Sequence, residues 1–298
     1  VKKIPFNIFR YIYIGMIASY INKLESGVYF GFPAKSFYDI LHFIHNSNII
    51  IADIIHSTDG LLYRCPPELY KKLTYRITIN HKTYRDLKNL YKKNNLENIS
   101  TRVQLIENKT DFDNTEYPER KSQILNIIYV GRGTAEKRIH LILKTARLLQ
   151  KNNKIHFHLI GDLSSYEKDS LKNVTFHGLI REKSKLAELY QLSDIILITS
   201  VYEGFPLVIM EAMKFGVIPI TTNVGGIYYH IKDDETGYLI CSNDENQIPH
   251  DISNKILELS NNNNKLRLLQ SNCYYYSKKN FHSNLFDNKY KSIFLINN

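Results

Sequence analysis

The stretch Ser200–Gly226, SVYEGFPLVIMEAMKFGVIPITTNVGG, constrains the fold more than any other part of this 298-residue chain. A short polar turn leads into a helical pattern over Pro206–Phe215, and Gly216 ends that pattern. The apolar run Val217–Thr221 then predicts a buried strand, which a second glycine turn closes. A helix followed at once by a fully apolar strand is typical of parallel α/β sheets, so we expect that class of fold.

Two carboxylates lie eight residues apart in this stretch, Glu203 on the polar turn and Glu211 about a turn and a half inside the helix. Pro206 suits the first helical turn, where a missing N–H costs nothing. The free N–H groups of that turn, together with the helix dipole, can bind an anion such as a diphosphate. Glu211 would then hold a pair of sugar hydroxyls, and Glu203 would face the transferred group. A buried crossover with two solvated glutamates fits the same spacing.

Strand and helix patterns alternate along the rest of the chain, as in parallel sheets with helices on their faces. In the first part, strands are predicted over Gly27–Phe32, Ile49–His56, Tyr75–Asn80 and Val103–Ile106, with helices over Phe37–His45 and Lys82–Lys93. In the second part, strands are predicted over Leu125–Val130, Ile155–Gly161, Val174–Gly178 and Asp194–Thr199, with helices over Arg138–Lys151, Leu186–Leu192, Ile252–Leu269 (interrupted at Asn261–Asn264) and Phe281–Leu295. The polar stretch Asp113–Gln123 is predicted as the linker between the two parts.

A glycine-containing loop follows the first strand of the second part. Gly131 and Gly133 would let the backbone approach a phosphate, and Arg132 and Lys137 would neutralise it. The spacing differs from G-x-G-x-x-G, so we predict no nicotinamide cofactor. Two surface cations at the start of a helix are the plain alternative.

The net charge of +10 is concentrated near the N-terminus. Val1–Lys93 contains 14 Lys and Arg against six Asp and Glu, a surplus of eight. Such a surplus suits an anionic membrane face or a polyanionic substrate. No nucleic-acid-binding motif accompanies it, so nucleic acid is not predicted as a partner, and a generally basic proteome explains the charge equally well.

An apolar segment near the N-terminus and the three cysteines bear on where the chain would be located. Ile8–Ile21 is apolar but is interrupted by Arg10 and falls short of the ~20 residues that a membrane span needs, so an amphipathic helix is predicted there. The three cysteines, Cys65, Cys241 and Cys273, lack metal-ligand spacing and suit a reducing compartment without structural disulfides.

The segments EGFPLVIME, EAM and GVIPITTNVGG closely resemble the donor-sugar signature of the family 4 (group 1) glycosyltransferases. The resemblance continues upstream through YVGRGTAEKR, HLIGD, VTFHG and LSDIILITS, in the order that the family has them. It covers Leu125–Ile240 well and Tyr75–Asp111 more loosely. It implies the GT-B fold, in which two Rossmann-like domains with parallel sheets face each other across a cleft.

The resemblance also implies which residues form the site. In the family, an arginine and a lysine at the positions of Arg132 and Lys137 grip the donor diphosphate, and a histidine after an early strand, here His56, faces the reacting sugar. The predicted catalytic residues are Glu203, Arg132, Lys137 and His56. The predicted donor-binding residues are Gly131, Arg132, Lys137, Gly178, Glu203, Gly204, Phe205, Pro206, Leu207 and Glu211.

This chain departs from the family pattern in several places. The family's glycine after the lysine is Arg138 here, and its proline and glutamate after Gly226 are Tyr228 and Tyr229. Its glycine-rich loop near the start of the first domain has no counterpart before Val28, so we expect a fragment or an unusually short member. The predicted boundaries are 1–117 for a truncated acceptor-side domain, 118–280 for the donor-binding domain and 281–298 for a helix that crosses back.

No metal or other cofactor is predicted, because Arg132 and Lys137 supply the positive charge. Asp111, Phe112 and Asp113 form a D-x-D sequence of the kind that holds metal in another glycosyltransferase fold. It falls in the predicted linker, away from the donor signature, and we interpret it as a solvated loop.

The predicted function is retaining transfer of a sugar from a nucleotide-diphosphate sugar to a glycan or lipid-linked acceptor in bacterial surface polysaccharide (LPS O-antigen or capsule) biosynthesis. The predicted location is cytoplasmic, peripheral on the inner face of the plasma membrane. Two alternatives stay open: a nucleotide-sugar 2-epimerase of the same fold, and an inactive or binding-only remnant.

Overall fold

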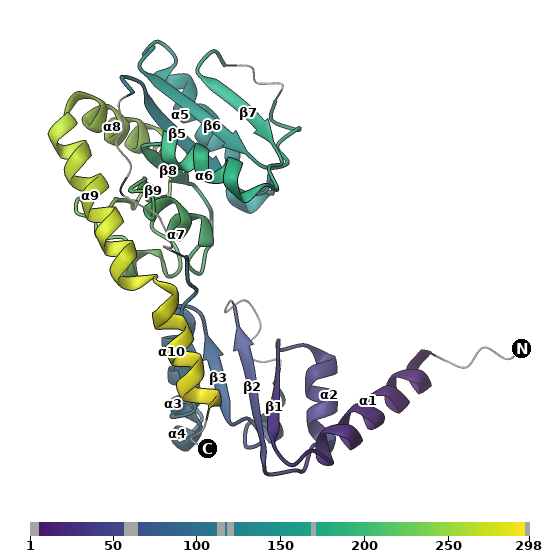
Figure 1. The fold of residues 1–298 in the computed structure, drawn as a ribbon. Coiled ribbons are helices and arrows are strands. Elements are labelled where there is room, and N and C mark those ends of the chain that lie inside the picture. The colour runs from purple at the N-terminus through teal and green to yellow at the C-terminus, as the bar shows by residue number, and fades with distance from the viewer. Residues whose placement is uncertain (1–5, 57–64, 112–116, 118–121, 168–170, 296–298) are drawn as a thin grey trace, which may run out of the picture. The chain divides into compact units, whose positions relative to one another are not determined.

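The computed structural model describes residues 6–56, 65–111, 117, 122–167 and 171–295 of the chain (Figure 1). The chain forms two compact units, one of Val1–Glu107 with Phe286–Asn298 and one of Asn108–Leu285. Each unit is built around its own parallel sheet flanked by helices, so the predicted α/β class with two Rossmann-like sheets is confirmed. Below, the two are called unit 1 and unit 2.

The sheet of unit 1 has four parallel strands in the order β1-β2-β3-β4. The strands are β1 (Gly27–Gly31), β2 (Ile49–Ile55), β3 (Tyr75–Thr78) and β4 (Val103–Leu105), and the helices are α1 (Phe6–Asn22), α2 (Lys35–Phe43), α3 (His81–Lys93), α4 (Glu97–Ser100) and the unit 1 part of α10 (Ser283–Phe294), with a 3-10 turn at Pro67–Leu69. Helix α3 begins at His81 because the side chain of Asn80 accepts a 2.8 Å hydrogen bond from the Thr83 backbone N–H. Every predicted element of unit 1 is present, with ends that differ by one or two residues.

Apolar residues fill both sides of this sheet. The apolar face of α2 (Phe37, Ile40 and Leu41) and its C-cap Ile44 are buried in the main core together with Ile14 of α1. Ile293 of α10 forms a second cluster with Ile77 and Ile106. These two clusters account for the apolar runs in the strands, which are buried on both faces.

A buried ion pair crosses the sheet of unit 1. Asp53 on β2 and Arg76 on β3 are fully buried, and their Oδ2 and Nη2 atoms lie 2.7 Å apart. The hydroxyl of Tyr38 donates to Asp53 at 2.8 Å, and Arg76 Nη1 donates to the Tyr91 hydroxyl at 2.8 Å. These hydrogen bonds satisfy charges that would otherwise be costly to bury.

The sheet of unit 2 has six parallel strands in the order β10-β9-β8-β5-β6-β7. The strands are β5 (Leu125–Val130), β6 (Ile155–Ile160), β7 (Val174–Gly178), β8 (Ile195–Ile198), β9 (Ile218–Thr222) and β10 (Tyr238–Ile240), and the helices are α5 (Ile139–Leu149), α6 (Lys183–Leu192), α7 (Leu207–Met213), α8 (Ile248–Asn261), α9 (Asn263–Asn280) and the first residues of α10, with 3-10 turns at Ala135–Lys137 and Ile227–Tyr229. The chain runs outward from β5 through β6 to β7, then returns and runs the other way from β8. The sheet therefore has a topological switch point between β5 and β8, where open α/β sheets bind ligands beyond the carboxyl ends of the strands.

Two helix boundaries in unit 2 have clear local causes. Helix α5 begins at Ile139 rather than at Arg138, because Arg138 has a left-handed backbone (φ 50°) that separates the Ala135–Lys137 turn from the helix. The predicted interruption in the asparagine run is confirmed at Asn262, whose side chain accepts from the Lys265 N–H and starts α9.

Several predicted features fall wholly or partly outside the described residues. These are the loop after His56 (57–64), the Phe112 and Asp113 part of the D-x-D sequence, and most of the Asp113–Gln123 linker. Among the helices that the structure does describe, none combines the length and the apolar character needed to cross a membrane.

Candidate functional site at the switch point of unit 2

Two loops meet at the switch point, one after β5 and one after β8. The loop after β5 passes through two positions that leave no room for a side chain. An added Cβ on Gly131 would lie 2.5 Å from the Tyr129 hydroxyl, and one on Gly133 would lie 2.7 Å from the Asp162 carbonyl oxygen. These glycines let the loop after β5 pack tightly against neighbouring protein atoms. Their predicted role, to let the backbone approach a phosphate, stays a prediction.

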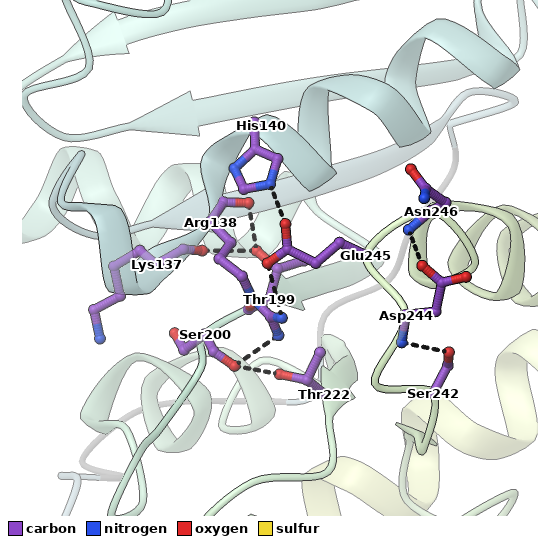
Figure 2. A network of polar contacts seen from close by, with 10 residues as sticks. All are labelled: Lys137, Arg138, His140, Thr199, Ser200, Thr222, Ser242, Asp244, Glu245 and Asn246. Carbon is purple, nitrogen blue, oxygen red and sulfur yellow. Dashed lines mark hydrogen bonds and ion pairs between the residues drawn. The ribbon is translucent and has the colours of Figure 1, made fainter.

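Arg138 ties the two loops together (Figure 2). Its Nε donates to the Thr199 carbonyl oxygen at 2.6 Å, and its Nη2 donates to the Ser200 carbonyl oxygen at 3.1 Å. In return, the Thr199 hydroxyl donates to the Lys137 carbonyl oxygen at 2.8 Å. Glu245 completes the network with an ion pair of 3.4 Å to Arg138 Nη1.

The backbone conformation at position 138 accounts for the glycine that the resemblance implies there. The position has a left-handed backbone conformation, which glycine adopts without strain and other residues adopt rarely. Here an arginine occupies it, and its two bonds to the carbonyl oxygens of Thr199 and Ser200 offset that strain. Sequence reasoning noted the substitution but did not predict this bracing role, because the partners come from the loop after β8, about 60 residues away.

Lys137 and Glu203 form the charged pair at the centre of the site. The Lys137 Nζ lies 2.6 Å from Glu203 Oε1, and the Ser200 hydroxyl donates to the same oxygen at 2.7 Å. The two side chains are 20% and 12% exposed, so the pair is largely shielded yet still reaches solvent. The structure thus brings together two of the predicted site residues, one from each loop.

The glycine turn at Gly225 and Gly226 packs against the backbone of Glu203 and Gly204. Gly226 N–H donates to the Gly204 carbonyl oxygen at 2.9 Å. Gly225 has a φ of 61°, and an added Cβ there would lie 1.6 Å from the Glu203 carbonyl oxygen. Gly225 and Gly226 therefore directly support the turn that contains Glu203 and Gly204. The sequence pattern alone did not reveal this contact.

Arg132 is placed differently from Lys137. Its side chain is 78% exposed and lies 3.6 Å from Glu136 in a solvent-facing ion pair. Its backbone carbonyl oxygen accepts from the Tyr129 hydroxyl at 2.8 Å. The arginine thus sits on the anchored loop with a side chain that is free to turn towards a ligand.

Glu211 lies on α7 beside a cavity of about 300 Å³. The Tyr190 hydroxyl donates to Glu211 Oε2 at 3.1 Å, and burial together with the neighbouring carboxylate raises the pKa of Tyr190, which keeps it protonated. Further lining comes from the segment before the linker, from α6 and from the residues just after α7: Lys109, Thr110, Asp111, Lys183, Leu186, Ala187, Lys214 and Phe215. The cavity has the mixed polar and apolar lining of a small-molecule site.

The remaining predicted donor residues have mixed surroundings. Phe205 is buried against the His230 ring, with centroids 4.3 Å apart, whereas Leu207 is 49% exposed at the start of α7. Pro206 was predicted in the first turn of the helix and is instead the N-cap of α7, which begins at Leu207. Gly178 ends β7 with a φ of 64°, and an added Cβ there would have nothing within 4 Å, so that side of the residue has room for a ligand.

His56 lies in unit 1 at the end of β2, where its ring centroid is 5.2 Å from that of Phe32. All the other predicted site residues lie in unit 2. Its role opposite the reacting sugar stays a prediction, as do the roles of the donor-binding residues.

Comparisons with known proteins concern mainly unit 2. The family model described as "Glycosyl transferases group 1" matches residues 111–279. An uncharacterized 41.2 kDa protein in the cps region of Klebsiella pneumoniae is 28% identical over 158 residues, which cover 49% of this chain and 44% of that protein. The capsular polysaccharide biosynthesis glycosyltransferase CapM of Staphylococcus aureus is 27% identical over 159 residues, covering 50% and 42%. The aligned segments thus span less than half the length of these relatives.

A solved structure extends the similarity to both units. The crystal structure of a mutant of S. aureus TarM in complex with fondaparinux, α-GlcNAc-glycerol and UDP has a TM-score of 0.73 to this chain at 19% sequence identity. The match covers 94% of this chain and 58% of TarM. At 19% identity, this likeness shows that the two proteins share a fold. The switch-point site of unit 2 lies within residues 111–279, which the family model matches.

Proposed function

Because the chain belongs to the group 1 glycosyltransferases and has their GT-B fold, we propose that it transfers a sugar from a nucleotide-diphosphate sugar to an acceptor hydroxyl with retention of anomeric configuration. The observation that carries the proposal is the Lys137–Glu203 pair, 2.6 Å apart, at the switch point of unit 2. A cation held beside a carboxylate at that point suits a ligand that has both phosphate and hydroxyl groups.

The chemistry assigned to the site needs no covalent enzyme intermediate. The bond between the anomeric carbon and the diphosphate oxygen breaks, and the acceptor oxygen forms its bond to the same carbon on the same face. The acceptor proton passes to the departing phosphate oxygen. Lys137 and the exposed side chain of Arg132 stabilise the negative charge that develops on the diphosphate, the kind of electrostatic contribution that usually dominates such catalysis.

Each of the other residues has an assigned part in this proposal. Glu203, held by Lys137 and Ser200, accepts hydrogen bonds from the transferred sugar, and Glu211 binds the ribose hydroxyls of the donor. In this proposal the half-buried end of β7 at Gly178 lies against the nucleotide base. A donor held by these residues and by two cations requires no metal, so we propose a metal-independent transferase.

The acceptor and the location are proposed from similarity and charge. CapM is named for capsular polysaccharide biosynthesis, and the cps-region protein of K. pneumoniae is similar to this chain over a comparable length. TarM was crystallised with UDP and a GlcNAc glycoside. We therefore propose a glycan or lipid-linked acceptor in surface polysaccharide synthesis. The basic surplus of Val1–Lys93 supports action at the anionic cytoplasmic face of the plasma membrane.

A donor screen followed by two variants tests the proposal. The chain is incubated with UDP-, GDP- and ADP-sugars, with and without polyprenyl-linked or simple glycoside acceptors, and the release of nucleoside diphosphate and the linkage formed are measured. Lys137→Ala and Arg132→Ala are each expected to lower transfer by about 10²–10³-fold, while their circular dichroism stays unchanged. Lys144→Ala, an exposed lysine on α5, is the matched control.

The outcomes separate the candidate functions. Both variants at the wild-type rate would refute the assignment of the phosphate site. A donor epimerised in the absence of any acceptor would favour a 2-epimerase. Donor binding with neither reaction would favour a binding-only remnant.

A further inference from the structure

A buried cluster of three aromatic rings lies next to the turn that contains Glu203 and Gly204. Phe205 directly follows this turn, and its ring centroid lies 4.3 Å from that of His230 and 5.4 Å from that of Phe281. The centroids of His230 and Phe281 are 5.1 Å apart, so each of the three rings contacts the other two. All three side chains are buried, and the cluster lies wholly within unit 2.

His230 reaches the cluster from the segment that follows the glycine turn. The Gly226 N–H donates to the Gly204 carbonyl oxygen at 2.9 Å, and the His230 N–H donates to the Ile227 carbonyl oxygen at 3.0 Å. On its other side, His230 Nδ1 lies 3.2 Å from the Tyr276 hydroxyl on α9. His230 is thus held between the glycine turn and α9.

Phe281 belongs to one of the two segments that join the units. The chain enters unit 2 between Glu107 and Asn108 and leaves it between Leu285 and Phe286. Phe281 is the C-cap of α9 and lies just before α10, the helix within which the chain leaves unit 2.

The two segments that join the units are bonded to each other at Phe281. The Thr110 N–H donates to the Phe281 carbonyl oxygen at 2.9 Å, and Thr110 also forms an isolated parallel β-bridge with His282. Thr110 in turn lines the cavity beside Glu211. Phe281 therefore contacts one joining segment through its main chain and Phe205 through its ring.

We propose that Phe281 is a positioning residue for sugar transfer, because it couples the two segments that join the units to the turn that carries Glu203. The expected effect on rate rests on the function proposed above, whereas the coupling itself does not. Rings packed at the density of a protein interior cannot move independently of one another. A shift of the joining segments would therefore move Phe205 and, two residues before it, Glu203.

The two charged groups of the site depend on this cluster to different degrees. Glu203 lies on the turn that the cluster supports, and in the proposed function it accepts hydrogen bonds from the transferred sugar. Lys137 lies on the loop after β5, which the Thr199 hydroxyl holds through the Lys137 carbonyl oxygen at 2.8 Å. Loss of the Phe281 ring should therefore disturb the contacts to the sugar more than those to the diphosphate.

Hydrogen exchange of the backbone amides tests the coupling in the full chain. Phe281→Leu removes the ring and keeps an apolar side chain in its place, and Phe157→Leu is the matched control, because Phe157 is a fully buried phenylalanine on β6. Mass spectrometry of peptides that cover residues 200–207 should show faster exchange in Phe281→Leu than in the wild type. In the same variant, peptides from β6 should exchange at the wild-type rate, and Phe157→Leu should leave residues 200–207 unchanged.

Kinetics and nucleotide binding test the positioning role. Phe281→Leu is expected to lower kcat for transfer at least about tenfold, while the Kd for UDP, GDP or ADP, whichever the wild type binds, changes less than about twofold. A general loss of stability would weaken both. Phe157→Leu is expected to keep both at the wild-type value, although its melting temperature also falls.

The outcomes distinguish this inference from the proposed function. Equal exchange over residues 200–207 in the wild type and Phe281→Leu would overturn the coupling. A kcat in Phe281→Leu equal to that in Phe157→Leu, or nucleotide binding lost along with kcat, would overturn the positioning role. If the wild type transfers sugar from no donor, the proposed function fails, and the exchange comparison then decides the coupling by itself.

Discussion

The ammonium of Lys137 lies 2.6 Å from the carboxylate of Glu203, although 66 residues separate them in the chain. The pair exists because β5 and β8 are neighbours in the sheet while β6 and β7 lie between them in sequence. Both residues follow the carboxyl ends of their strands, and Arg138 locks the two loops together by bonding the backbone of Thr199 and Ser200. The position of the candidate site is thus a consequence of the strand order.

Gly225→Ala is expected to reduce transfer by about 10²-fold. The new Cβ would lie 1.6 Å from the Glu203 carbonyl oxygen, at a φ of 61° that disfavours alanine, so the Glu203 turn must move. A displacement of about 1 Å in a reacting site costs about that factor in rate. The measurement is kcat/KM for the donor, alongside circular dichroism. Gly15→Ala is the control, because Gly15 lies within α1 with nothing within 4 Å of its Cβ position and alanine favours the helix. Equal activity in both variants would contradict the supporting role of the glycine turn.

Tyr190→Phe is expected to raise the donor KM about fivefold with little change in kcat. The substitution removes the hydroxyl that donates to Glu211 Oε2 at 3.1 Å and leaves the ring in place. A loss of about 1 kcal/mol in the positioning of Glu211 corresponds to that ratio. Initial rates against donor concentration measure the effect, with the exposed Tyr202→Phe as the control. A fall in kcat with an unchanged KM would argue against a role for Glu211 in holding the donor.

The order and type of most elements could be predicted from the sequence, because the apolar runs are short and sharply bounded. Strand β10 was not predicted, and helices α8 and α9 extend from Ile248 to Asn280 rather than over Ile252–Leu269. β5 and β7 match the predicted ranges Leu125–Val130 and Val174–Gly178, and most other ends differ by one or two residues. The Asp53–Arg76 pair could not be foreseen, since Asp53 lies within an otherwise apolar strand and its partner is known only from the strand pairing. The Arg138 brace was missed for a similar reason: it joins two loops that only the strand order of the sheet brings together.

Lowering the pH from 6.5 to 4 is expected to destabilise unit 2 through His158. Its pKa is about 4 in the folded protein against about 6.5 when unfolded, so the unfolded chain binds more protons in that interval and stability falls as the pH falls. The effect is at most about 3 kcal/mol, and less where solvent screens the ring. Denaturant titrations at several pH values, with EDTA present, measure it. His158→Gln should flatten this dependence and His250→Gln should keep it; an equal slope in all three proteins would contradict the assignment.

The last prediction concerns the outer face of α1. Phe9, Ile12, Tyr13, Met16 and Tyr20 form a stripe at helical spacing, and each is between 55% and 68% exposed, whereas Ile14, Ala18 and Ile21 face the core. Aromatic and apolar side chains on a helix in a strongly basic segment suit shallow insertion into an anionic lipid surface.

We therefore expect the chain to sediment with vesicles that contain phosphatidylglycerol, and to be released as salt is raised from low to high concentration. Each Lys or Arg near such a surface contributes about 1 kcal/mol, within a screening distance of about 10 Å at 0.1 M salt. Replacing Tyr13 and Met16 by serine should weaken binding without changing the fold, because both side chains are exposed; Leu148→Ser, on an exposed position of unit 2, should not. The chain should bind neutral vesicles only weakly, since these lack the negative charge that attracts its Lys and Arg side chains. No binding at low salt, or binding that salt leaves unchanged, would show that the basic surplus does not hold the protein at a membrane, and a water-soluble glycan would then be the better acceptor to pursue.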